Sequence, residues 1–131
     1  MKIDKVYTKK GDDGSTSLSA KSKIPKDNIL VEMLGSLDEL NSFIGLAKAS
    51  IKNNKEFISI YISLLKAQNT IFDIGAEISL LTSKNKKFIV VPENTKSIEK
   101  EIDTLNKKLN TLNSFILPGT GMENAYLHIS R

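Results

Sequence analysis

Residues 28–50, NILVEMLGSLDELNSFIGLAKAS, decide the fold because their apolar side chains recur at intervals of three and four positions. This spacing predicts an amphipathic α-helix whose apolar stripe packs on a neighbouring element. Gly35 and Gly45 interrupt the pattern, and each costs a helix about 1 kcal/mol relative to alanine. We therefore expect another helix or a ligand to approach this helix closely. The stripe runs through Leu30, Met33, Leu34, Leu37, Leu40, Ile44, Ala47 and Ile51.

Helical patterns also fill most of the remaining chain. Residues 56–81 are apolar over more than half of a helix circumference, which is typical of a helix within a bundle or at a subunit interface. A third helix, from 93–95 to about 112, has one narrow apolar seam, and a last helix begins near Met122. These patterns predict an all-α, up-and-down helical bundle. A short extended arm over 2–7 precedes it, and Asp27 is the predicted N-cap of the first helix.

Length and composition describe one domain of 131 residues, of which 40% are apolar and 26% are charged. The net charge of +4 suits an anionic small molecule as well as nucleic acid, and decides neither. The chain has no cysteine, which excludes disulfides, thiolate metal sites and cysteine nucleophiles. No apolar run approaches the roughly 20 residues that span a bilayer, and no secretory signal follows Met1. A cytoplasmic protein is expected.

Residues 8–17, TKKGDDGSTS, carry the clearest functional signature. Gly11 and Gly14 permit backbone conformations that other residues avoid, and they let a ligand come close to the main chain. Exposed N–H groups in such a turn bind anions, and Lys9 and Lys10 add positive charge, so a phosphate is the natural guest. The alternative is a solvated turn, because the Gly-Lys-Ser/Thr ending of a Walker A loop is missing.

Four other residues have a functional and a plain structural interpretation. Asp38 shares a helix face with Asn41, where it is either a functional carboxylate or only an exposed one. Arg131 is the only arginine of a lysine-rich chain, so its rigid fork has either a specific role or none. Phe115 precedes a Pro-Gly break and would normally belong to the core. His128 is a poor candidate for a metal site, because no second histidine or cysteine accompanies it.

Seven short segments, which together extend along essentially the whole chain, form an ordered set. They are Tyr7-Thr8-Lys9-x-Gly11-Asp12-x-Gly14 with Thr16-Ser17, Lys26-Asp27, Leu37-Asp38-Glu39-Leu40-Asn41-Ser42, Ile44-Gly45, Phe72-Asp73-x-Gly75-Ala76, Ser114-Phe115-Ile116-Leu117-Pro118-Gly119 and Leu127-His128-x-x-Arg131. In this order and spacing they resemble the PduO-type ATP:cob(I)alamin adenosyltransferases, the corrinoid adenosyltransferases that include a human mitochondrial enzyme. No single segment is decisive, and the specificity of the match comes from their combination.

The resemblance implies one domain, with an ATP-binding segment over 1–27 and a helical bundle over 28–131. The family fold is a five-helix bundle that assembles as a homotrimer with active sites between subunits. The implied reaction transfers the 5′-deoxyadenosyl group of ATP to the cobalt of cob(I)alamin, assisted by Mg²⁺. Asp38 would pair with Arg131 across the subunit boundary, and Phe115 would replace the lower axial ligand of the corrin. ATP would lie along Thr8, Lys9, Lys10, Gly11, Thr16, Ser17 and Lys26.

The residue types suit this chemistry, because cobalt(I) is itself the nucleophile and the protein need only align ATP and stabilise the leaving triphosphate. A flavin reductase or an adenosylcobalamin-dependent acceptor enzyme is an expected partner, whereas nucleic acid and membranes are not. Lys10 replaces the usual threonine of the family, and the family continues for some tens of residues beyond the position of Arg131. We therefore expect a truncated form, weakly active or inactive. The alternatives are a non-catalytic ATP- or cobalamin-binding relative and a helical interaction module.

Overall fold

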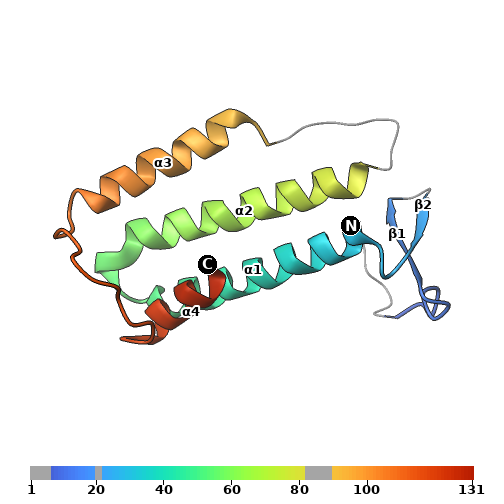
Figure 1. The fold of residues 1–131 in the computed structure, drawn as a ribbon, viewed down its shortest axis with the longest axis horizontal. Helices are drawn as coiled ribbons and strands as arrows, with labels where there is room; N and C mark the ends of the chain where they lie inside the picture. The colour runs from blue at the N-terminus through green and yellow to red at the C-terminus, as the bar shows by residue number, and fades with distance from the viewer. Residues whose placement is uncertain (1–6, 20–21, 82–89) are drawn as a thin grey trace.

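The computed structural model describes residues 7–19, 22–81 and 90–131, which form a helical bundle with a small sheet at one end (Figure 1). Successive helices run in alternating directions, so the predicted up-and-down bundle is confirmed. The predicted arm over 2–7 lies outside the described residues, except for Tyr7. The helices are α1 (Ile29–Ile51), α2 (Ile58–Leu80), α3 (Pro92–Asn106) and α4 (Met122–Ser130).

Asn28, and not Asp27, caps the start of α1. Asn28 Oδ1 accepts a hydrogen bond from the backbone N–H of Leu30 at 3.0 Å. The backbone N–H of Asn28 donates to Pro25 O at 3.2 Å, which closes a turn in front of the helix. Both residue types are good caps, and this turn places Asn28 at the extended position from which a side chain reaches the free helix N–H groups.

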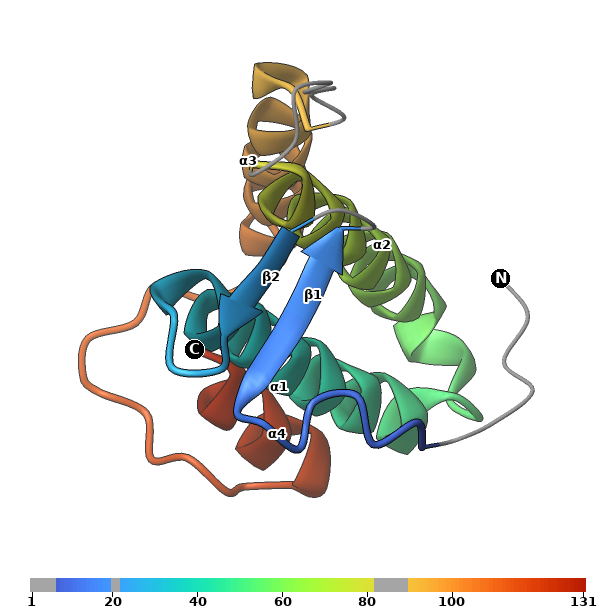
Figure 2. The same cartoon turned by 90° about the vertical axis from the view of Figure 1, so that its right-hand side faces the viewer.

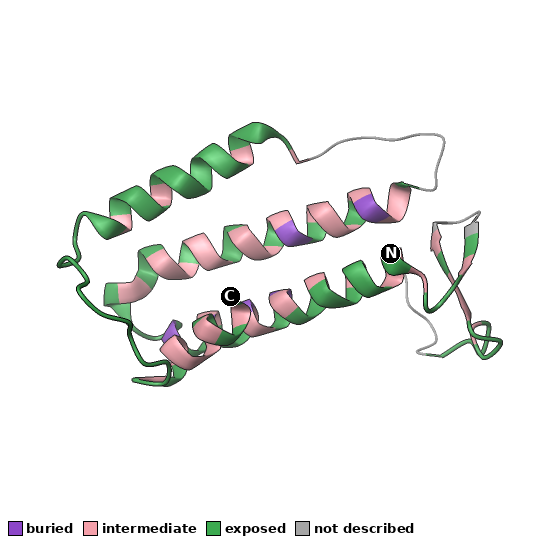
Figure 3. Ribbon diagram, in the orientation of Figure 1, coloured by how far each residue is buried: buried purple, intermediate pink, exposed green. Residues whose placement is uncertain are grey.

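The core lies where α1 packs against α2 and α4. Its buried apolar side chains belong to the predicted stripe of α1 and to the facing side of α2 (Figure 3). Gly45 meets α2 closely, because an added Cβ would lie 3.2 Å from Gln68 Nε2, whereas Gly35 has no such neighbour within 4 Å. Close approach is therefore confirmed at one of the two glycines. The buried apolar residues are Ile44, Ala47, Ile51, Ile71 and Ile78.

Much of the apolar surface of α2 stays exposed in one copy of the chain. Phe72 is 65% exposed and Ile58 is 57% exposed. Helix α3 covers α2 only loosely, since a cavity of about 450 Å³ separates them and a hydrogen bond from Ser63 Oγ to Glu101 Oε1 joins them. These faces are open to a partner. In the described part of the chain, no helix combines the length and apolarity needed to cross a membrane.

Helix α3 ends at Asn106, about six residues earlier than its seam predicts. Leu109 and Leu112 continue the seam in the sequence, yet each is 67% exposed. No apolar partner covers them in this copy, and the asparagine and threonine residues between and beside them are weak helix formers. Residues 107–121 therefore form a loop that leads to α4, which begins at Met122 as predicted.

A β-hairpin that the sequence analysis did not predict occupies the polar N-terminal segment. Strand β1 (Ser15–Ser19) pairs antiparallel with β2 (Ser22–Pro25), and Ser17 faces Lys23 in the register. The hairpin crosses the end of the bundle where α1 begins and α2 ends (Figure 2), and β1 contacts α2. The strands are mostly polar, so they lack the apolar alternation by which a strand is usually identified.

Candidate functional site

The turn in front of β1 is compact and hydrogen-bonded. Lys9 has a φ of 58° and Gly14 has a φ of 80°, so both lie in the left-handed region, which is uncommon for lysine. Asp12 N donates to Lys9 O at 3.3 Å, and Gly14 N donates to Gly11 O at 3.2 Å. Lys26 N donates to Gly14 O at 2.9 Å, which joins the turn to the end of β2.

Asp13 ties the turn to both strands of the hairpin. Its Oδ1 accepts hydrogen bonds from Ser15 N at 3.1 Å and from Ser15 Oγ at 2.6 Å, and its Oδ2 accepts one from Lys23 Nζ at 2.5 Å. The hydrogen bond from Lys23, and then those from Ser15, hold the pKa of Asp13 far below its usual value. The carboxylate therefore stays ionised and holds the turn against β1 and β2.

A cavity of about 560 Å³ lies between the turn and the hairpin. The described residues that line it include three lysines and no carboxylate, so its complementary guest is an anion. Its serine and threonine residues add hydroxyl groups that donate hydrogen bonds to anionic oxygens. The lining consists of Thr8, Lys10, Gly11, Ser15, Thr16, Ser17, Lys23 and Lys26.

Gly11 occupies a position where no side chain fits. A Cβ there would lie 2.8 Å from Ser15 O and 3.3 Å from Lys26 Cε. Gly14 has nothing within 4 Å, but its positive φ favours glycine. The two reasons that the sequence offers for a glycine are thus divided between the two residues: Gly11 allows close approach and Gly14 allows the backbone conformation.

The structure brings six of the seven residues predicted to contact ATP to this cavity: Thr8, Lys10, Gly11, Thr16, Ser17 and Lys26. Lys9 does not line it, and its backbone instead forms the turn. Ser15 and Lys23 line the cavity although the sequence analysis did not assign them. The pairing of β2 with β1 brings Lys23 to the cavity, so a prediction of the hairpin from the sequence would have identified it.

A second cavity, of about 460 Å³, lies between α1 and α2. Asp38 and Asn41 both line it, as their shared helix face predicts. Asn41 is 5% exposed, and its buried Oδ1 accepts no hydrogen bond within the described chain. A buried polar atom without a partner costs about 1–3 kcal/mol. A hydrogen-bond donor from outside the chain that entered this cavity could therefore be bound by Asn41 Oδ1, which would remove this cost.

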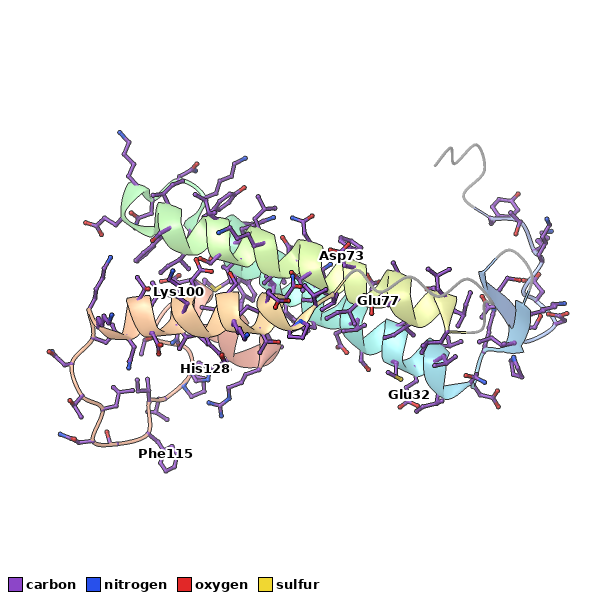
Figure 4. The ribbon with its side chains drawn as sticks, turned by 90° about the horizontal axis from the view of Figure 1, so that it is seen from above. Glu32, Asp73, Glu77, Lys100, Phe115 and His128 are labelled. Atoms are coloured by element: carbon purple, nitrogen blue, oxygen red, sulfur yellow. The ribbon has the colours of Figure 1, made fainter. Side chains whose placement is uncertain are left out.

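Phe115 lies in the loop between α3 and α4, and its side chain is fully exposed, at 105% of the reference value. Figure 4 shows it projecting away from the helices. Leu117 in the same loop is 81% exposed. The interpretation of this segment as core is therefore wrong for one copy of the chain. Exposed apolar side chains grouped in this way suit contact with a ligand or with another protein surface.

Asp38 and Arg131 are both exposed, and no ion pair joins them within the part of one copy that the structure describes. Arg131 directly follows α4, whereas Asp38 lies in the first half of α1. Among the described residues, no group of three or more His, Cys, Asp or Glu side chains is placed to hold a metal ion. His128 accordingly belongs to no such group.

The anion cavity and Phe115 lie at opposite ends of the bundle. Figures 1 and 4 both show the hairpin beside the start of α1 and the loop 107–121 near the other end of that helix. Helix α1 has 23 residues, which corresponds to a length of about 35 Å. Within one copy, these two parts are therefore too far apart to contact one small substrate together.

Known proteins similar to this chain share one description. A family model described as cobalamin adenosyltransferase matches residues 6–131. The corrinoid adenosyltransferase of Bacillus subtilis (strain 168) is 38% identical over 127 residues, which are 97% of this chain and 65% of the relative. The human corrinoid adenosyltransferase MMAB is 31% identical over 135 residues, or 99% of this chain and 53% of the relative. The chain thus spans about half to two thirds of the length of these relatives.

Solved structures agree with the sequence comparison. A single-residue variant of a PduO-type ATP:corrinoid adenosyltransferase from Lactobacillus reuteri, complexed with cobalamin and ATP, has a TM-score of 0.85 at 29% identity, over 96% of this chain and 70% of that one. Another variant, complexed with ATP, has a TM-score of 0.82 at 30% identity, over 95% and 69%. Sequence and fold together show that this chain belongs to the cobalamin adenosyltransferase family.

Proposed function

We propose that this protein transfers the 5′-deoxyadenosyl group of ATP to the cobalt of cob(I)alamin. Cobalt(I) supplies both electrons of the new cobalt–carbon bond and becomes cobalt(III). The bond between C5′ and the triphosphate oxygen breaks, and the triphosphate leaves with that electron pair. Adenosylcobalamin and triphosphate are the only products, so the step balances without another reactant. The observation that carries this proposal is the lysine-lined cavity at the hairpin, in a chain of this family.

The cavity residues would bind and stabilise the triphosphate. Lys10 and Lys26 would neutralise phosphate charge, and the hydroxyl groups of Thr16 and Ser17 would donate hydrogen bonds. Negative charge grows on the triphosphate as the C5′–O bond breaks, so cations already in place stabilise the transition state more than the ground state. The chain needs no general base, because no proton is removed in this step.

The residues at the cavity do not fit a magnesium ion held by the protein. Mg²⁺ prefers carboxylate and phosphate oxygens, and the described residues that line the cavity include no carboxylate. The resemblance to the family leads us to expect Mg²⁺ in the reaction, and it would therefore arrive bound to the phosphates of ATP.

Phe115 is the proposed contact on the cobalt side of the reaction. Its exposed aromatic ring could cover the lower face of the corrin and exclude the lower axial ligand. Loss of that ligand makes the reduction of cobalt(II) easier. Cobalt(I) holds no axial ligand, so a cobalt(II) that has already lost its lower ligand has none to release on reduction. This role does not require Phe115 to bind ATP.

The proposed site is shared between subunits of a homotrimer. The cavity and Phe115 lie at opposite ends of one copy, so a transfer between them requires parts of two copies. Exposed apolar surface on α2, including Phe72, offers a contact area. Asp38 and Arg131, unpaired with each other within one copy, would pair across that boundary.

Mixed oligomers test the shared site. The variants D38A and R131A should each be inactive or nearly so, while a refolded mixture should regain activity at those boundaries where an intact Asp38 meets an intact Arg131. A mixture as inactive as its components would contradict the shared pair. Sedimentation equilibrium on the unmixed protein would show directly whether three copies assemble.

The proposed setting of the enzyme is the cytoplasm, where a flavin reductase could supply cob(I)alamin and an adenosylcobalamin-dependent enzyme could accept the product. Both partners are suggested by the resemblance to the family, and the chemistry supports them, because cobalt(I) must be generated close to its use and the product is itself a cofactor. No nucleic acid is required by any step of this reaction.

The decisive experiment follows the conversion of chemically reduced cob(I)alamin to adenosylcobalamin by absorbance, with ATP and Mg²⁺. We expect slow product formation with the wild-type chain and a further strong loss with K26Q, while the helical circular dichroism stays unchanged. ATP binding without product would favour a non-catalytic relative. Absence of both ATP binding and product would favour a helical interaction module and would overturn the proposal.

A further inference from the structure

Within the described residues, Lys23 is the one lysine of the anion cavity whose ammonium group has a carboxylate partner. It lies on β2 opposite Ser17, which the cavity also includes. Its Nζ donates to Asp13 Oδ2 at 2.5 Å. Asp13 itself does not line the cavity. Lys23 thus stands between the cavity, where an anion would bind, and a carboxylate outside it.

We propose that Lys23 is a third phosphate-binding residue and that Asp13 holds it until the triphosphate arrives. On binding, the Lys23 ammonium moves from the Asp13 carboxylate to a phosphate oxygen, while Asp13 keeps its hydrogen bonds to Ser15. The pair is therefore a latch that opens when the site fills. This inference rests on the proposed function only in taking the triphosphate of ATP as the anion.

Because the Lys23–Asp13 pair is exposed, little free energy is needed to break it. The side chains of Lys23 and Asp13 are 59% and 55% exposed, and ion pairs in such surroundings add little to stability. A triphosphate carries several negative charges and offers more acceptor oxygens than one carboxylate, so it competes effectively for the ammonium group. The lysine side chain is long and flexible, which allows its head group to move while β2 stays paired with β1.

The hydrogen bonds of the turn keep the rest of the site in place when the latch opens. Asp13 Oδ1 still accepts from Ser15 N and Ser15 Oγ, so β1 remains attached to the turn. Lys26 N still donates to Gly14 O, which fixes the end of β2. The exchange therefore needs a rotation of one side chain and no opening of the hairpin.

Binding of inorganic tripolyphosphate, measured by calorimetry at low salt, tests the latch without cobalamin. We expect K23Q to weaken binding about three- to tenfold, as loss of one charge-assisted hydrogen bond does, and K23R to bind within about twofold of wild type. K52Q is the matched control, because Lys52 follows α1 at the opposite end from the hairpin. It should bind like wild type.

Asp13→Asn keeps an oxygen for Ser15 but loses the charge that holds Lys23. We expect D13N to tighten tripolyphosphate binding about two- to threefold, and to have no such effect when combined with K23Q. Equal affinities for K23Q and K52Q would overturn the inference, as would weaker binding by D13N. Loss of binding with K26Q but not with K23Q would support the proposed ATP site and would contradict the proposed role of Lys23. Failure of the wild type to bind would overturn both.

Discussion

Substitution of Gly11 by alanine tests whether the cavity depends on close backbone packing. The added Cβ would lie 2.8 Å from Ser15 O and 3.3 Å from Lys26 Cε, so either the turn or β1 must shift by several tenths of an ångström. Overpacking of this kind typically costs about 1–3 kcal/mol. The turn is mostly exposed, so Gly11 can shift locally while the hydrogen bonds between Asp13 and Ser15 keep the turn on β1, and the folded state avoids most of this cost.

The proposed binding of ATP at this cavity requires the original geometry, so the same cost should appear in the dissociation constant for ATP. About 1–3 kcal/mol corresponds to weakening of about 5- to 150-fold. Calorimetric titration of G11A with ATP measures this directly. The melting temperature should change little, because the clash lies outside the core formed by α1, α2 and α4.

The matched control is the same substitution at Gly35. An added Cβ there meets nothing within 4 Å, and removal of a helix glycine favours the folded state by about 1 kcal/mol. G35A should therefore melt slightly higher than wild type and bind ATP with an unchanged dissociation constant. An unchanged dissociation constant for G11A as well would refute the argument that Gly11 shapes the ATP cavity.

Three further outcomes follow from the burial and charge of single residues. F115A should lower kcat about 10- to 100-fold and leave both the ATP dissociation constant and the melting temperature nearly unchanged, since the side chain is fully exposed; equal losses in kcat and ATP affinity would contradict its proposed role at the corrin. I44A should lower the free energy of unfolding by about 2–5 kcal/mol, because Ile44 is 8% exposed, whereas I29A, at a residue that is 62% exposed, should change it by less than about 0.5 kcal/mol in denaturant titrations. The lowered pKa of Asp13 means that its stabilising contribution is present above the unfolded pKa of about 3.9 and is lost as pH falls through the lower folded value, so carbon-detected NMR should find this carboxyl titrating at a lower pH in the folded than in the unfolded chain.

The helices could be predicted because their signal is local. The stripe of α1 predicts its length to within a residue, and its buried members Ile44 and Ala47 do form core. The predicted end of α3 was wrong because an apolar seam does not reveal where the neighbouring helix stops covering it. Leu109 continues the seam but is exposed. Periodicity identifies a face that must be covered, and tertiary packing decides whether this copy covers it.

The anion cavity was predicted in part, for an equally physical reason. Gly11 and Gly14 mark the turn in the sequence, and the lysines beside them mark its charge. Lys23 was missed because its place depends on strand pairing, which the mostly polar sequence of β1 and β2 does not indicate. Asp13 was missed because its role depends on where Ser15 and Lys23 come to lie.

The residues proposed to contact the two substrates, the cavity lysines and Phe115, are open to solvent in one copy of the chain. Lysines in an open cavity act through water, which screens their attraction for a developing charge. In the proposed reaction, the same lysines would stabilise a leaving triphosphate far better once a second surface excludes water from them. A single copy leaves the hairpin cavity open at one end of the bundle and Phe115 exposed at the other. Assembly would then bring the two substrates together and also create the dry surroundings in which these charges are effective.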